Sequence, residues 1–321
     1  MRLLTNSFFV AILLVAMCLG CDSRKTFGIR DELNPVTFEE LLALSAEELE
    51  RVDIGRMNLL CAIDALGGDT NDFERCLARL EQWTEHIKRE EARLMPVFER
   101  NRARYDNSLA KFKAVNLVLA IKEDFNCRYN KRLADSGAMA DLNSPAFFRN
   151  PHDVFISGLL LQKRGTCSSY PPLIVALGRR AGYPLCLKAT LGHLFCCWDD
   201  GKETFNIDTN GEGVDTPSDD FYKRGVFGQV NNYSELQQRG EGFFHPLSNA
   251  EALGVFVETS GFSHEANGRL DEAIRRYRMA LKYRPGSENL QRLAARRLPG
   301  EPLRLPPNPK SSRTSSSCTR R

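Results

Sequence analysis

The sequence lacks a marked excess of charge of either sign. The 321 residues carry a formal net charge of +3. Six cations and one acid lie in the terminal segments, and without them the body of the chain has a formal charge of −2; they are Arg2, Arg304, Lys310, Arg313, Arg320, Arg321 and Glu301. A nearly neutral body argues against a nucleic-acid partner, because binding to nucleic acid needs a concentrated basic surface.

Long apolar runs are also scarce, and the one that stands out lies between Phe8 and Met17. Its ten residues are too few to cross a bilayer comfortably. The run follows Arg2 and ends sharply before the polar residues 22–25. This pattern predicts a signal peptide over residues 1–20, and it disfavours a transmembrane helix or a buried N-terminal helix. No second run of sufficient length follows, so we expect a soluble protein beyond the leader.

The signal segment ends in Cys18-Leu19-Gly20-Cys21, which resembles a bacterial lipobox. In a lipobox the cysteine becomes the first mature residue and carries the lipid. The sequence therefore predicts an exported lipoprotein of bacterial type that faces the periplasm or the cell exterior. Its contact with the membrane would be the lipid on Cys21 alone. Cys18 stands where a leucine is more typical, and plain secretion is the alternative.

The cysteines lack the spacing of a structural zinc site. Ten are present, and no C-x-x-C pair occurs among the eight that follow Cys21. Cys196 and Cys197 lie near His193, but successive residues of a strand point to opposite faces, so both thiols cannot join one metal site. We therefore expect no metal and no cofactor, and packed core positions for these two cysteines. Export permits disulfides, and Cys186 is a candidate partner for either of the two.

Helical patterns dominate the first half of the chain and return near its end. After a linker over residues 21–36, a helical region is expected over 37–144. Between Phe73 and Ile87 the apolar residues recur at steps of three and four, apart from one step of one. Residues 246–298 have the spacing of a tetratricopeptide-like helical hairpin, which cannot bury its apolar face alone and should pack on the rest of the protein. The Pro-, Ser- and Arg-rich residues 299–321 are expected to be a disordered tail.

The residues that could carry chemistry are concentrated between 145 and 245. A turn ending at Cys167 leads into an apolar helical segment that stops at Gly182, which places Cys167 at or next to a helix N-terminus. Three short strands are expected after this helix. The Asp-Gly pair before the third strand predicts a two-residue hairpin turn, and the strands cover residues 185–190, 193–199 and 202–208.

The predicted hairpin fixes which side chains face one another. With Asp200 and Gly201 as the turn, His193 would lie directly across from Asp208 on the same face of the sheet. A carboxylate beside a histidine fixes its tautomer and stabilises its charged form. A helix start and a neighbouring histidine both favour the thiolate form of cysteine. Cys167, His193 and Asp208 are therefore predicted to be the catalytic nucleophile, the general base and the orienting acid.

Acyl transfer at Cys167 would also need hydrogen-bond donors for a developing oxyanion. Backbone N–H groups at the helix start are expected to serve, and Gln162 is a candidate side-chain donor. The alternative for Cys167 is an inert thiol buried in an apolar helix, and the alternative for Asp208 is a residue that merely ends its strand. The joint placement of Cys, His and Asp favours catalysis over these alternatives.

Four motifs carry a family resemblance, and they are Arg164-Gly165-Thr166-Cys167, Gly178-Arg179-Arg180-Ala181-Gly182-Tyr183-Pro184, Gly192-His193-Leu194-Phe195 and Phe205-Asn206-Ile207-Asp208. They resemble the transglutaminase-like superfamily, in the bacterial branch that adds helical N-terminal segments and a tetratricopeptide-like tail. The resemblance implies an α+β fold with a papain-like core over residues 145–245, made of a helix and a small antiparallel sheet. It also implies that the cysteine lies on the helix, and the histidine and aspartate on adjacent strands.

The resemblance implies a thiol hydrolase or acyltransferase that acts on amide or peptide bonds through an acyl-enzyme. Water as the acceptor would make the protein a protease or amidase, and an amine would make it a transglutaminase. The expected partner is a peptide or protein substrate, and no motif in the sequence indicates which one. The alternative is a non-catalytic scaffold lipoprotein that binds a protein partner through its tetratricopeptide-like tail.

Overall fold

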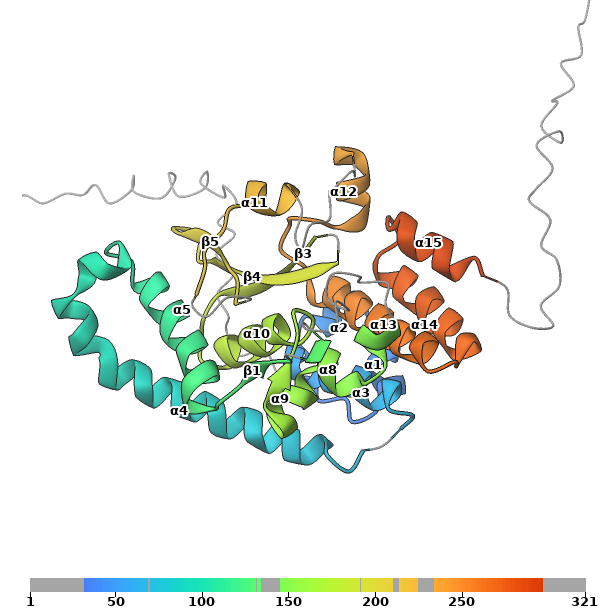
Figure 1. Cartoon of the computed structure of the whole chain (residues 1–321), viewed down its shortest axis with the longest axis horizontal. Helices are drawn as coiled ribbons and strands as arrows, with labels where there is room; N and C mark the ends of the chain where they lie inside the picture. Colours follow the sequence, from blue (N-terminus) through green and yellow to red (C-terminus); the bar gives the residue numbers. More distant parts are fainter. Residues whose placement is uncertain are drawn as a thin grey trace, which may run out of the picture. The chain divides into compact units, whose positions relative to one another are not determined.

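The computed structural model describes residues 32–68, 70–130, 132–133, 145–190, 192–209, 214–224 and 234–296. The predicted signal peptide, the lipidation site Cys21 and the predicted tail over 299–321 lie outside these described residues. The chain from Leu33 onward forms one unit that mixes helices with a small antiparallel sheet, so the predicted α+β class is confirmed (Figure 1). None of the helices in the described ranges has both the length and the apolar character needed to cross a membrane.

Four helices open the described chain. The short helices α1 (Phe38–Ala43) and α2 (Ala46–Leu49) are capped by serine or threonine hydroxyls, and α2 has a full capping box. Helix α3 (Ile54–Ala65) is buried along most of its length and stops before Gly67, which has a φ of 83°. Such a left-handed conformation favours glycine, which explains where this helix ends.

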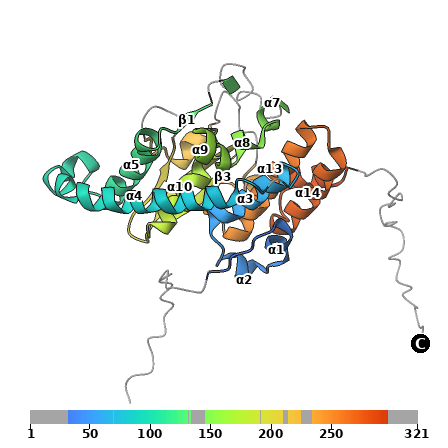
Figure 2. The ribbon, with the colours of Figure 1, turned by 90° about the horizontal axis from the view of Figure 1, so that it is seen from below.

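Helix α4 (Phe73–Arg100) is long, and the chain then returns alongside it (Figure 2). The return begins with a 3₁₀ turn, η1 (Arg102–Tyr105), and continues as α5 (Leu109–Leu119). Its last turn, η2 (Ala120–Asp124), is a π-helix. The chain then enters the short strand β1 (Arg128–Tyr129), which is one wall of the candidate site.

Helix α10 (Tyr170–Arg180) lies at the centre of the fold, where it contacts α3, α4 and the sheet. Its two prolines stand in the first turn, where no backbone N–H is needed for the helix. Several short elements lead into it. They are α7 (Pro145–Phe148), α8 (Pro151–Val154), α9 (Ile156–Gln162) and β2 (Arg164–Gly165), the last of which pairs in parallel with β1.

The antiparallel sheet has the order β3–β4–β5. Leu187, Cys196 and Ile207 form one cross-strand row, and the Cys196 Sγ lies 3.4 Å from the carbonyl oxygen of Pro171 in α10. This row therefore belongs to the face that packs on α10. Helix α11 (Asp219–Lys223) packs on the opposite face, where Tyr222 stacks on Phe195. The strands are β3 (Leu185–Thr190), β4 (His193–Asp199) and β5 (Thr204–Ile207).

The predicted two-residue turn between β4 and β5 is wrong. Asp199 pairs with Thr204, so four residues, 200–203, connect the strands. The side chain of Asp200 explains the longer connection, because its Oδ1 accepts hydrogen bonds from the backbone N–H groups of Lys202 and Glu203, at 2.9 and 2.8 Å. The register is therefore shifted by two residues from the predicted one, and each side chain keeps its expected face.

The two adjacent cysteines of β4 occupy different environments. Cys196 faces α10 and is completely buried. Cys197 points the other way and forms a disulfide with Cys186, its direct partner on β3. The alternation predicted for these residues is confirmed, and the disulfide partner that the sequence leaves open is Cys197.

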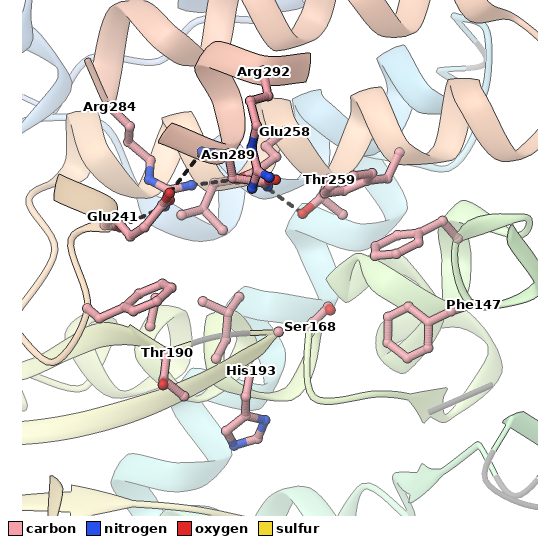
Figure 3. A pocket seen from close by; sticks show the side chains of 17 residues that line it. Phe147, Ser168, Thr190, His193, Glu241, Glu258, Thr259, Arg284, Asn289 and Arg292 are labelled. Carbon is pink, nitrogen blue, oxygen red and sulfur yellow. Dashed lines mark hydrogen bonds and ion pairs between the residues drawn. The ribbon is translucent and has the colours of Figure 1, made fainter. Parts of the chain in front are cut away.

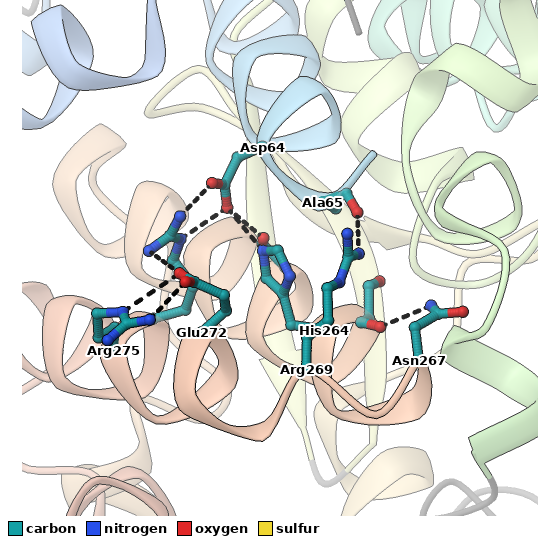
Figure 4. Close-up of polar contacts among 10 residues, drawn as sticks. Asp64, Ala65, His264, Asn267, Arg269, Glu272 and Arg275 are labelled. Atoms are coloured by element: carbon teal, nitrogen blue, oxygen red, sulfur yellow. Dashed lines mark hydrogen bonds and ion pairs between the residues drawn. The ribbon is translucent and has the colours of Figure 1, made fainter. Parts of the chain in front are cut away.

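The C-terminal helices pack against the N-terminal ones. They are α12 (Glu235–Glu241), α13 (Asn249–Ala266), α14 (Leu270–Tyr283) and α15 (Glu288–Ala294), and α13 contacts α3 directly. Figure 4 shows the polar contacts at this junction. The Asp64 carboxylate at the end of α3 accepts hydrogen bonds from Arg276 and from the Ser260 hydroxyl, and the His264 Nε2 lies 3.5 Å from it.

Candidate active site

Cys167 lies in a tight turn, three residues before the first residue of α10. The carbonyl oxygen of Thr166 accepts hydrogen bonds from the N–H groups of Ser169 and Tyr170, at 3.1 and 3.0 Å, so the turn runs directly into the helix. The hydroxyl groups of Thr166 and Ser169 donate to the carbonyl oxygen of Asp153, at 2.9 and 3.2 Å. These bonds fix the backbone on both sides of the thiol.

Gly165 allows the turn to sit this close to its neighbours. A Cβ at this position would lie 2.4 Å from the Ser169 Oγ and 2.7 Å from the Leu159 side chain, and no real Cβ tolerates such distances. The motif Gly-Thr-Cys therefore has a steric basis, because a larger residue would push β2 away from the start of α10.

Tyr129 is a neighbour of the thiol that the sequence did not reveal. β1 pairs with β2 so that Tyr129 stands beside Gly165, and this places its hydroxyl close enough to the Cys167 thiol for the thiol to affect the pKa of Tyr129. The rings of Tyr129 and Tyr170 stack at 5.7 Å with an interplanar angle of 8°. Burial raises the pKa of Tyr129 well above its usual value, and the nearby Cys167 raises it further. This hydroxyl therefore keeps its proton.

His193 and Asp208 come together as the sequence predicts, but by a different geometry. The His193 Nε2 lies 3.1 Å from the Asp208 Oδ2, with the two side chains 1% and 11% exposed. The register of β4 and β5, extended by one pair, puts Asp208 opposite Phe195. The imidazole therefore reaches the carboxylate diagonally along one face of the sheet.

Two further donors hold the Asp208 carboxylate. The Tyr222 hydroxyl donates to its Oδ2 at 2.7 Å, and the backbone N–H of Thr209 donates to its Oδ1 at 2.7 Å. Tyr222 comes from α11, is fully buried, and stacks on Phe195 at 4.1 Å. No pattern in the turn-rich sequence around Tyr222 indicates this role, because it arises from the packing of α11 on the sheet.

The two polar neighbours of His193 determine the pKa of its imidazole. Burial alone would lower its pKa, but the hydrogen bonds with Asp208 and with Cys167 outweigh burial and raise the pKa to about 9. Since Nε2 is engaged by Asp208, the ring nitrogen available to the thiol is Nδ1. The three predicted site residues thus form one connected group, with the imidazole in the middle.

Gln162 does not join this group. It is exposed, and its Oε1 accepts a hydrogen bond from the Arg164 side chain at 2.9 Å, whereas Cys167 is only 2% exposed. The reason is the backbone of Lys163, which has a φ of 62° and ends α9 between Gln162 and the turn. The side-chain donor beside the thiol is therefore Tyr129.

A cavity of about 380 Å³ opens beside the connected group (Figure 3). Ser168, Thr190 and His193 line one side, and polar residues of the C-terminal helices line the other. On that second side the buried Arg284 binds both Glu241 and Glu258. Cys167 and Asp208 are not among the lining residues, and the imidazole of His193, only 1% exposed, points away from this wall, so the cavity lies next to the candidate catalytic residues and does not contain them.

Comparisons with protein-family models, with curated proteins and with solved structures gave no match. Among the described residues, no three His, Cys, Asp or Glu side chains form a cluster that could hold a metal ion. The chemistry of the site must be inferred from the side chains around Cys167 themselves.

Proposed function

We propose that the protein is a transglutaminase-like thiol hydrolase or acyltransferase that acts on amide or peptide bonds through Cys167. The observation that carries this proposal is the position of His193, which contacts Asp208 through Nε2 and lies close enough to the Cys167 thiol for the thiol to raise the imidazole pKa. A histidine held in this way can take the thiol proton, and the carboxylate stabilises the imidazolium that results. The central helix followed by three antiparallel strands supports a papain-like core for the same residues.

The proposed reaction has two halves. His193 accepts the thiol proton at Nδ1, and the Cys167 sulfur attacks the substrate carbonyl carbon, so that a C–S bond forms and an electron pair moves to the carbonyl oxygen. When this intermediate collapses, the C–N bond breaks and His193 gives its proton to the leaving amine. Water or a second amine then attacks the thioester with His193 as the base, which releases the product and restores the thiol.

The cavity supports the assignment of the C-terminal helices to substrate binding. Residues of α13 and α15 line the wall across the cavity from Ser168 and His193, and the ion pairs of Arg284 fix part of that wall. A peptide bound in this cavity would lie beside Ser168, the residue that follows Cys167. In this proposal the tetratricopeptide-like hairpin is part of the enzyme's substrate site.

We also propose that the protein is exported and anchored through a lipid on Cys21. The leader pattern motivates this proposal, and the Cys186–Cys197 disulfide supports it, because disulfides persist in oxidising compartments. Metabolic labelling with an alkyne fatty acid should modify the unaltered protein and not Cys21→Ala. Equal labelling of both would contradict lipidation at this residue.

Alkylation with iodoacetamide, followed by mass spectrometry, tests the catalytic proposal. Cys61, Cys76 and Cys127 are buried free thiols and serve as internal controls. Burial raises the pKa of Cys76 and of Cys127 to about 12, so these thiols should react slowly. Cys167 should react faster than all three, and His193→Ala should remove this advantage. Equal rates for the four thiols would contradict an activated nucleophile.

Exposed apolar side chains on the C-terminal helices favour a second candidate function. Leu236 is 78% exposed and Leu270 is 47% exposed, which suits a non-catalytic scaffold lipoprotein with a protein partner. Cys167→Ser separates the two functions in the native host. Loss of function in this variant with the fold intact supports the enzyme, and retained function that disappears with Leu236→Glu and Leu270→Glu supports the scaffold.

A further inference from the structure

The backbone N–H of Cys167 stands out among its neighbours. The N–H of Thr166 donates to the Ser169 Oγ, the N–H of Ser168 donates to the Thr166 Oγ1, and the next two N–H groups donate to the Thr166 carbonyl. Within the described ranges, no group accepts a hydrogen bond from the N–H of Cys167, although this residue is only 2% exposed. Because buried N–H groups are rarely left unpaired, this one is suited to receive an oxygen from a ligand.

The Tyr129 hydroxyl is a second donor near the same sulfur, because the pairing of Tyr129 with Gly165 and the stacking of its ring on Tyr170 hold it beside the turn that contains Cys167. In a tetrahedral intermediate the oxyanion and the sulfur are bonded to the same carbon. A donor that lies near the sulfur in the free protein can therefore reach the oxyanion with little movement. The hydroxyl keeps its proton near neutral pH, since its pKa lies well above the usual value.

We propose that the Tyr129 hydroxyl and the Cys167 N–H together form the oxyanion hole, with Tyr129 as a further catalytic residue. This inference rests on the proposed thiol chemistry. It assigns to the two-residue strand β1 a role that neither its length nor its sequence suggests. The donor that was expected from the sequence, Gln162, is exposed and bound to Arg164.

The surroundings of Tyr129 hold its hydroxyl in a fixed position. Its backbone is paired with β2, where the N–H of Asn130 donates to the Gly165 carbonyl at 2.9 Å. Its ring is stacked on Tyr170, the first residue of α10. Donors that are already in place stabilise a developing charge without the cost of reorganisation, and this is what gives an oxyanion hole its effect.

The test compares two reactions of Cys167 in full-length Tyr129→Phe. In acylation by 4-nitrophenyl acetate, the thiolate attacks the ester carbonyl, an oxyanion forms, and the C–O bond breaks with release of 4-nitrophenolate. In alkylation by iodoacetamide, the thiolate displaces iodide from a CH₂ carbon and no oxyanion forms. Tyr129→Phe should slow acylation by about a hundredfold, while alkylation changes by less than about threefold. Tyr170→Phe, which removes a neighbouring hydroxyl and keeps its ring, should match the unaltered protein in both reactions.

Three outcomes of this test would overturn the proposal. Acylation of Tyr129→Phe at the normal rate would overturn the oxyanion role. A parallel loss of acylation and alkylation would also overturn it, because Tyr129 would then act on the thiol and not on the intermediate. If the unaltered protein shows no acylation at Cys167 while Cys167→Ser behaves identically, the thiol chemistry itself is wrong, and this inference falls with it.

Discussion

The His193 Nε2 lies 3.1 Å from the Asp208 Oδ2, even though the two residues are not direct partners in the sheet. A direct cross-strand pair would place the side chains next to one another with little choice of geometry. The diagonal contact instead depends on the Tyr222 hydroxyl and the Thr209 N–H, which turn the carboxylate toward the imidazole. The Asp208 carboxylate is thus positioned by α11 as much as by the strand that precedes it.

Replacing Asp208 by asparagine should disable the site and leave the fold intact. The amide cannot stabilise an imidazolium, and it can hold the ring in the wrong tautomer. We expect acylation of Cys167 by 4-nitrophenyl acetate to slow by about a hundredfold or more. Asp220→Asn is the matched control, because its carboxylate is 76% exposed and pairs with Lys223 at the surface. Similar rates in the two variants would show that Asp208 does not assist the histidine.

The raised pKa of His193 predicts that the folded protein becomes less stable as the pH rises. This pKa is raised to about 9 in the folded protein, from an ordinary value of 6.5. The folded state therefore binds the proton more tightly than the unfolded state. The stabilisation that results is fully present below pH 6.5 and is lost as the pH rises through 9.

Urea unfolding measured across this pH range should reveal the effect. The free energy of unfolding should fall by about 1–3 kcal/mol between the two limits in the unaltered protein. His193→Gln cannot titrate and should show a flatter profile. If the variant keeps the full decline, the loss of stability comes from other groups and the imidazole is not held as described.

The cluster at the end of α3 should be among the most sensitive polar sites for stability. The Asp64 carboxylate is 7% exposed, and bonds from Arg276, His264 and Ser260 hold its pKa below the usual range although burial alone would raise it. Asp64→Asn would leave the guanidinium of Arg276 without its buried counter-charge, at a cost of about 3–5 kcal/mol in the free energy of unfolding.

A neighbouring ion pair provides the control for this prediction. Glu272 also pairs with Arg276, but its side chain is 38% exposed, so Glu272→Gln should cost less than about 1 kcal/mol. The stabilisation from Asp64 should be present above the ordinary aspartate pKa of 3.8 and disappear as the pH falls through the lower folded value. Equal costs for the two variants in urea unfolding would show that the α3–α14 junction does not depend on Asp64.

Local sequence patterns predicted most of the helices and strands, because periodicity and capping are local properties. Cys167 precedes α10 as expected. The turn after β4 could not be predicted in the same way. Asp-Gly is typical of a two-residue turn, and the preference was reversed by hydrogen bonds that the Asp200 side chain makes with the following backbone.

The parts of the site that escaped prediction depend on contacts between distant segments. Tyr129 reaches the thiol because two very short strands pair in parallel, and strands of two residues leave no periodic pattern. Tyr222 reaches Asp208 because α11 packs on the sheet. Cysteine spacing could not choose between Cys196 and Cys197 as the partner of Cys186, and the strand register decided it.

The four-residue connection after β4 keeps His193 and Asp208 on the same face of the sheet. Side chains on a strand alternate between faces, so an even displacement returns each of them to its original side, whereas an odd one sends them all across. The hairpin differs from the simplest one by an even step, which is why Asp208 still meets His193. A slip of a single residue would carry the carboxylate to the side of α10 and separate the acid from its base.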